Sequence, residues 1–105
     1  MKFGLPDATV DQLQGVLARQ PQVEKAILYG SRAKGNFRNG SDIDLTLYGG
    51  SDLDMPVLYR ILEEIDDLLL PYQVDLSLFH DIDDPELIAH IQRVGLPFYE
   101  KVIHP

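Results

Sequence analysis

The chain has 105 residues, of which 45% are hydrophobic, no cysteine, and a formal net charge of −8 at pH 7. This length suits one small domain over residues 1–105. The lack of cysteine excludes disulfides and thiolate metal ligands. The negative net charge argues against direct DNA binding, because phosphate backbones are bound by clustered Lys and Arg. No apolar run is long enough to span a membrane and no secretory leader is evident, so we expect a cytoplasmic protein without a membrane partner.

The chain is predicted to begin with a loosely held segment and a helix. Residues 1–6 are expected to form this short lead. After them, apolar residues recur every three or four positions, which predicts a helix that Pro21 ends. Asp7 or Thr9 is expected to cap this helix, because their side-chain oxygens can accept hydrogen bonds from free backbone N–H groups.

Two strands are predicted next, joined by a basic loop. Residues 23–30 are expected to form a strand buried on both faces, because residues 26–29 are continuously apolar. Residues 31–34 are expected to form a short helical turn. Residues 43–48 alternate between polar and apolar side chains, which predicts a second strand with one polar face.

A second long helix is predicted after a Gly-Gly break. Its apolar stripe runs from Leu58 to Leu69. A residue within 51–54 is expected to cap it, with Pro56 tolerated in the first turn. The helix should end before Pro71, because a residue that precedes proline disfavours the helical conformation.

The last part of the chain predicts a strand, a helix and a final extended segment. Residues 73–79 alternate as a third strand, and Asp84-Pro85 places proline at the favoured first position of a helix that Gly95 closes. Residues 96–103 are expected to form an edge strand or an extended tail. The fold class we expect is α/β (α+β), a small mixed β-sheet with flanking helices.

The stretch from Gly30 to Leu45, GSRAKGNFRNGSDIDL, carries the predicted chemistry. Successive side chains of a strand point to opposite faces, so Asp42 and Asp44 share one face, where they can hold a hard cation such as Mg2+. Gly30 lets the backbone come close to a ligand. Ser31 adds a hydroxyl group at the start of a helical turn, whose free N–H groups favour an anion. A phosphate site and a metal site are therefore predicted to face each other across one loop.

A third carboxylate, Asp75, lies on the following predicted strand. If the two strands are neighbours, Asp75 can converge with the first two carboxylates. The three together can hold two metal ions for an in-line displacement at phosphorus. Asp75 can then also help to deprotonate the attacking hydroxyl. The alternative is an exposed aspartate on an edge strand. Arg32 directly follows Gly-Ser and is the expected contact for departing pyrophosphate, whereas surface solubility explains Lys34 and Arg38 as well as catalysis does.

The spacing of these residues resembles a family signature. Gly30-Ser31 is followed by ten residues and then by Asp42-Ile43-Asp44, which resembles the polymerase-beta-like nucleotidyltransferases. The surrounding GSRAKG and SDIDL resemble their small bacterial branch, the minimal nucleotidyltransferases, and the resemblance covers most of the chain. It implies a nucleoside triphosphate, ATP, as substrate, with Mg2+ as cofactor, two ions being expected. The expected nucleotide-binding residues are Gly30, Ser31 and Arg32, and the expected catalytic and metal-binding residues are Asp42, Asp44 and Asp75.

The same resemblance implies a protein partner. Members of this branch are typically paired with a HEPN-type RNase toxin, act as its antitoxin, and can transfer AMP from ATP to a tyrosine of the toxin. The toxin's own Arg-x(4–6)-His signature is missing, because the first histidine after Arg93 is His104, so the chain resembles the antitoxin and a hetero-oligomer is one expected state. Two alternatives stay open: a binding module with a decayed site that neutralises the toxin by contact, and a transferase that acts on a small hydroxyl compound. The missing second substrate domain counts against the latter.

Overall fold

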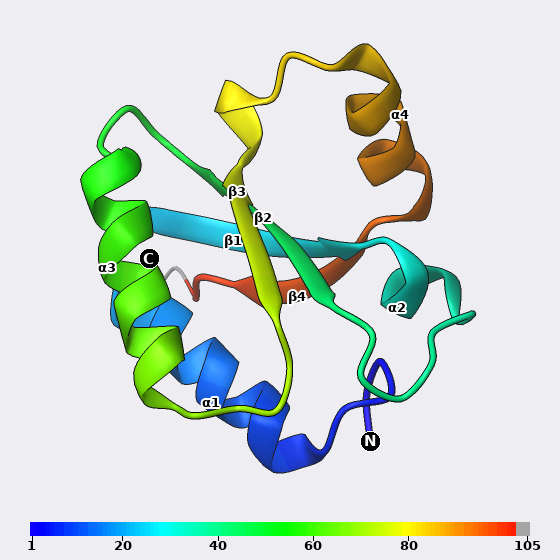
Figure 1. Ribbon diagram of the computed structural model, residues 1–105. Coiled ribbons are helices and arrows are strands. Elements are labelled where there is room, and N and C mark those ends of the chain that lie inside the picture. The colour runs from blue at the N-terminus through cyan, green and yellow to red at the C-terminus, as the bar shows by residue number, and fades with distance from the viewer. Residues whose placement is uncertain (103–105) are drawn as a thin grey trace.

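The computed structural model describes residues 1–102, which form one four-stranded sheet with helices on both of its faces (Figure 1). No helix in this part of the chain is long and apolar enough to cross a membrane. In chain order the elements are α1 (Asp7–Ala18), β1 (Val23–Tyr29), α2 (Ser31–Lys34), β2 (Ile43–Gly49), α3 (Met55–Asp67), β3 (Val74–Leu78), the 3-10 turn η1 (Phe79–Asp81), α4 (Pro85–Val94) and β4 (Leu96–Glu100).

The sheet is mixed, as expected, with the strand order β3-β2-β1-β4. β1 pairs antiparallel with both β2 and β4, and β2 pairs parallel with β3. The parallel pair needs a crossover connection, and α3 supplies it. β2 and β3 are therefore neighbours, which is the condition that the predicted convergence of carboxylates required.

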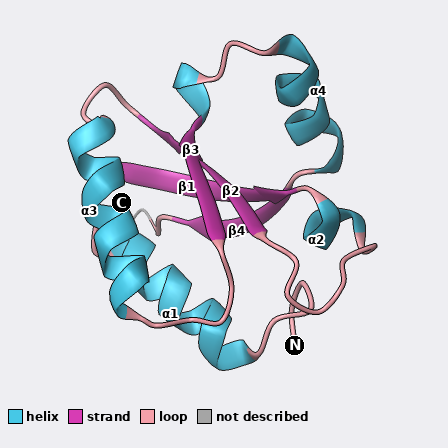
Figure 2. Cartoon of the chain, in the orientation of Figure 1, coloured by secondary structure: helices cyan, strands magenta, loops and turns pink. Residues whose placement is uncertain are grey.

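The main core lies between one face of the sheet and the helices α1 and α3, while α4 lies on the other side and the short α2 follows the end of β1 (Figure 2). Alternate residues of β2 point into this core, which leaves Asp44 and the residues in phase with it on the opposite face. The fully buried side chains of the core include Leu13, Val16 and Leu17 of α1, Leu28 of β1, Ile43, Leu45 and Leu47 of β2, and Ile61 of α3.

The two helices that follow an Asp-x-Pro or Asp-Pro sequence begin as predicted. The Asp54 carboxylate accepts a hydrogen bond from the backbone N–H of Val57 at 3.2 Å, and the Asp84 carboxylate accepts one from Glu86 at 3.0 Å. The prediction for α1 was wrong, because Pro6 occupies its N-cap position and no side chain caps it. Asp7 instead pairs with the α-ammonium group of Met1 at 3.2 Å.

The N-terminal segment is held more firmly than its sequence indicated. Leu5 is fully buried in the core, and the ring of Phe3 lies 5.7 Å from that of Phe98 in β4. Lys2 and Leu5 also form an isolated β-bridge. The prediction of a loose lead was therefore wrong, because Leu5 fills a place in the core and Phe3 packs against it.

Three further expectations needed correction. β1 is fully buried on one face only, because Ile27 and Tyr29 are half-buried on the face that α4 partly covers. Leu69 lies beyond the end of α3 with a φ of 54° and 88% of its surface exposed, so it is not part of the buried stripe. Phe79 leaves the third strand and begins η1.

The final segment proves to be an edge strand, β4, which resolves the alternative left open by the sequence. β4 ends at Glu100, so residues 101 and 102 of the predicted extension do not belong to it. Position 103 and the histidine at position 104 lie outside the described residues.

Candidate active site

A row of polar side chains crosses three strands on the face opposite the main core. In the β-sheet register, Asp75 of β3 is directly opposite Asp44 of β2, and Asp44 is directly opposite Tyr29 of β1. The structure thus brings together two of the three predicted carboxylates. Asp42 lies just before β2 and is exposed. Asp75 is also exposed and lies on the edge strand β3, which are the features expected if it were only a surface aspartate.

The carboxylates are close enough to affect one another's charge. The pKa of Asp44 is raised to about 6, and the largest cause is burial. The negative charge of Asp75, a hydrogen bond with Asp75 and the negative charge of Asp42 raise it further, in that order. A raised pKa means that the native fold disfavours the ionised form of Asp44. Positive charge at this place would relieve the repulsion between the carboxylates.

Tyr29, Ser77 and His90 also belong to this site, although we did not predict them from the sequence. The pKa of Tyr29 is raised by burial and by the charges of Asp44 and Asp75, against the opposing effect of a hydrogen bond with Ser77. The His90 ring of α4 meets the Tyr29 ring edge-on, with centroids 6.2 Å apart. Tyr29 could have been found, because it ends the strand directly before Gly-Ser. The position of His90 depends on how α4 folds back over the sheet.

Gly30 places the backbone of the predicted phosphate loop against the carboxylates. Its φ is +78°, which side chains of L-residues rarely allow, and a Cβ atom at this position would overlap a carboxylate oxygen of Asp44. The half-buried Ser31 follows as the first residue of α2. The predicted nucleotide-binding pair is therefore adjacent to the carboxylate row.

Arg32 has a different environment from the one its predicted role requires. Its side chain is buried, and it donates two hydrogen bonds to the carbonyl oxygen of Ser41, at 3.1 and 2.9 Å, and one to that of Phe3, at 2.9 Å. These bonds hold the guanidinium within the protein, so the structure disfavours the predicted contact with pyrophosphate. Lys34 and Arg38 are exposed.

The residues of this site fit a magnesium ion that a nucleotide helps to bind. Within residues 1–102 no three acidic or histidine side chains are grouped closely enough to hold a metal ion by themselves. Mg2+, however, usually takes one or two protein carboxylates and completes its shell with water and substrate phosphates. The repelling pair of Asp44 and Asp75, next to Gly30, supplies hard oxygen donors of this kind.

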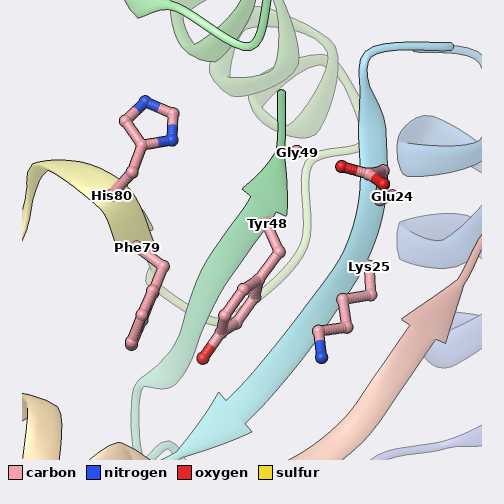
Figure 3. Close-up of a pocket in the computed structure, with 6 residues that line it drawn as sticks. All are labelled: Glu24, Lys25, Tyr48, Gly49, Phe79 and His80. Carbon is pink, nitrogen blue, oxygen red and sulfur yellow. The ribbon is translucent and has the colours of Figure 1, made fainter. Parts of the chain in front are cut away.

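A separate hollow of about 380 Å³ lies at the other end of β1 and β2 (Figure 3). The rings of Tyr48 and Phe79 stack there with centroids 4.4 Å apart, and Lys25 Nζ lies 4.6 Å from the centre of the Tyr48 ring. Tyr48 is four residues beyond Asp44 on β2, which is about 13 Å at the usual rise of a strand. The hollow is therefore distinct from the carboxylate site.

Comparisons with known proteins agree with this geometry. The family model described as "Polymerase beta, Nucleotidyltransferase" matches residues 11–103. A comparison with curated protein sequences finds no match. Among solved structures, a toxin–antitoxin complex with AMP-PNP has a chain that is 19% identical, with a TM-score of 0.70 over 88% of this chain and 73% of that chain.

Two further structures share the fold. One is the complex of a tri-AMPylated Shewanella oneidensis HEPN toxin with its MNT antitoxin, at 17% identity and a TM-score of 0.65, covering 90% of this chain and 71% of that chain. The other is a candidate minimal nucleotidyltransferase at 23% identity and a TM-score of 0.65, covering 92% of this chain and 96% of that chain. The family model spans Gly30-Ser31, Asp42, Asp44 and Asp75, and we conclude that this chain belongs to the polymerase beta nucleotidyltransferase family.

Proposed function

We propose that this protein is a Mg2+-dependent nucleotidyltransferase that transfers AMP from ATP to a tyrosine of a HEPN-type toxin and thereby acts as its antitoxin. The observation that carries the proposal is the pairing of Asp44 with Asp75 beside Gly30, within a fold of this family. The similarity to one toxin–antitoxin complex that contains AMP-PNP and to another whose toxin is AMPylated supports both the donor and the acceptor.

Each residue of the site has a part in this reaction. Asp42, Asp44 and Asp75 would hold Mg2+, which when bound neutralises and orients the nucleotide phosphates. The backbone of Gly30 and the hydroxyl of Ser31 would bind the outer phosphates. Asp75 is exposed on the edge strand β3, where an incoming hydroxyl group can reach it, so we assign it the transfer of the attacking proton.

The acceptor in this proposal comes from outside the chain. Two of the three carboxylates are exposed, and the carboxylate row lies on one face of the sheet and reaches its edge strand β3. A partner can therefore present a hydroxyl group to it on a mobile segment, with the site aligning the in-line attack. This geometry favours a protein acceptor over a small molecule, which a site this open would hold poorly.

One observation favours a second candidate function. Because the similar solved structures include complexes of a toxin with its antitoxin, the protein could instead neutralise the toxin by contact alone. Under this alternative, the carboxylates have no part in neutralisation.

Co-expression with the toxin tests the two candidates. Intact-mass spectrometry of the toxin should show added adenylyl groups with the native protein and none with Asp42→Asn combined with Asp44→Asn. Asp66→Asn combined with Asp67→Asn is the matched control, because it removes two exposed carboxylates of α3 and should leave the modification unchanged. Full neutralisation by the first double variant, together with an unmodified toxin in the native complex, would establish the contact mechanism.

A further inference from the structure

We propose that Arg32 is a positioning residue that fixes the phosphate loop and the carboxylate strands relative to one another. The inference deepens the proposed function, on which its catalytic consequence rests. It starts from an unusual feature of the fold, a guanidinium group that is 3% exposed and donates only to backbone carbonyls and not to a carboxylate. None of the ion pairs among residues 1–102 includes it.

The partners of Arg32 join the two ends of the loop between α2 and β2. Arg32 follows Ser31 directly, and its acceptor Ser41 directly precedes Asp42. Both Nε and one terminal nitrogen donate to the same Ser41 oxygen, which fixes the orientation of the peptide group that leads into Asp42. The loop cannot change its spacing between phosphate site and carboxylate without breaking these bonds.

The guanidinium also contacts the segment that leads to the third carboxylate. It lies 5.2 Å from the centre of the Phe37 ring and 5.2 Å from that of Tyr72, distances at which a cation is attracted to an aromatic face. Tyr72 stands three residues before Asp75. One side chain therefore contacts the approaches to both Asp42 and Asp75.

The N-terminal segment completes this arrangement. Its Phe3 carbonyl accepts the third hydrogen bond of Arg32, and Gly4 lies so close to the Phe37 ring that a Cβ atom there would overlap it. The N-terminal segment passes beside the loop between α2 and β2 in Figure 1. We call Arg32, its two carbonyl acceptors and the two rings the arginine bracket.

Lysine cannot replace arginine in the bracket. The planar guanidinium presents donors in a fixed fork and stacks on aromatic faces, whereas an ammonium group is a compact point charge. Arg32→Lys therefore keeps the charge and loses the simultaneous contacts with Ser41 and Phe3. A residue that bound phosphate by charge would tolerate this change far better than one that positions two segments.

The first experiment does not depend on catalysis. Hydrogen–deuterium exchange should be faster in Arg32→Lys at residues 1–5 and 36–42 than in the native protein, with the exchange of β1 unchanged. Arg60→Lys, an exposed arginine of α3, is the matched control and should exchange like the native protein throughout. Phe37→Leu, which keeps the charge and removes one ring, should speed exchange in the same two segments and serves if Arg32→Lys folds poorly.

The second experiment measures the reaction with the toxin. Because a displacement of about 1 Å at a reacting group can lower a rate about 100-fold, we expect a fall of that order in kcat for Arg32→Lys, with the KM for ATP changed less than about threefold. The inference would be overturned if hydrogen–deuterium exchange of both segments in Arg32→Lys matched that of the native protein while the KM for ATP rose. Arg32 would then be a phosphate ligand. If the native protein transfers no AMP, the proposed function fails, while the exchange data still decide whether the bracket positions the loop.

Discussion

Asp44→Asn should stabilise the metal-free protein at neutral pH, although it removes a group that we place in the active site. The native fold raises the pKa of Asp44 to about 6 by burial and by the neighbouring carboxylates. Folding therefore brings an ionised carboxylate into an unfavourable place at pH 7. Asparagine keeps nearly the same shape without the charge, so the repulsion disappears.

The size of this effect follows from the pKa. A rise from 3.8 to about 6 corresponds to about 3 kcal/mol at 1.36 kcal/mol for each pH unit. Asp44 is only half-buried, so water screens part of this energy, and we expect a gain of about 1–2 kcal/mol. For a domain of about this length, each kcal/mol raises Tm by about 4–8 °C.

The size of the stability difference between Asp44→Asn and the native protein depends on pH. The native state holds the Asp44 proton more tightly than the unfolded state, so the native protein loses stability as the pH rises from about 4 through about 6. The asparagine variant lacks this titration. Its advantage should therefore be small near pH 4 and complete by about pH 7.

Urea unfolding of both proteins from pH 4 to pH 7, with a chelator present, measures this difference. Asp52→Asn is the control, because it removes an exposed carboxylate from the turn after the far end of β2. Lower stability of Asp44→Asn at pH 7, or a difference that does not vary with pH, would refute the electrostatic reasoning and indicate a structural role for the carboxylate.

Three further predictions follow from the site and its supports. Gly30→Ala should destabilise the protein by about 1–3 kcal/mol in chemical unfolding, because it strains the backbone and collides with Asp44. Gly35→Ala, at a similar φ with open space around it, should cost only about 1–2 kcal/mol and should spare nucleotide binding. Asp54→Ala should lower the free energy of unfolding by about 1 kcal/mol, because it removes the N-cap of α3, and Asp54→Asn should restore it. Calorimetric titration with ATP should show binding only when Mg2+ is present, and equal affinity in excess chelator would contradict the metal-binding role of the carboxylates.

The sequence predicted those parts of the fold that depend on local patterns. Alternation along β2 correctly placed Asp44 on the face away from the core. The cap of α3 was correctly placed within residues 51–54, and Asp84-Pro85 was correctly recognised as the start of a helix. These features need only neighbouring residues, because strand alternation and helix capping are local effects. The mixed sheet was also predicted, whereas the adjacency of β2 and β3 was left open by the sequence and is established by the structure.

The parts that the sequence did not reveal depend on contacts between distant segments. Arg32 resembles a phosphate ligand in the sequence, and its burial becomes evident only when Phe3 and the two aromatic rings are brought around it. The burial of Leu5 depends on how the N-terminal segment folds back against the core, which its local sequence does not show. His90 reaches Tyr29 only because α4 returns over the sheet.

The position of β4 has a consequence for how the chain folds during synthesis. β1 lies between β2 and β4, and Leu28 pairs with Leu96, a residue made long after it. At 5–20 residues per second, the ribosome needs about 3–14 s to add the residues between them. Throughout that interval one edge of an apolar strand stays unpaired and can join the strand of another chain. The nascent protein is therefore prone to aggregation until β4 emerges, and a chaperone or partner that covers the free edge of β1 would protect it at that stage.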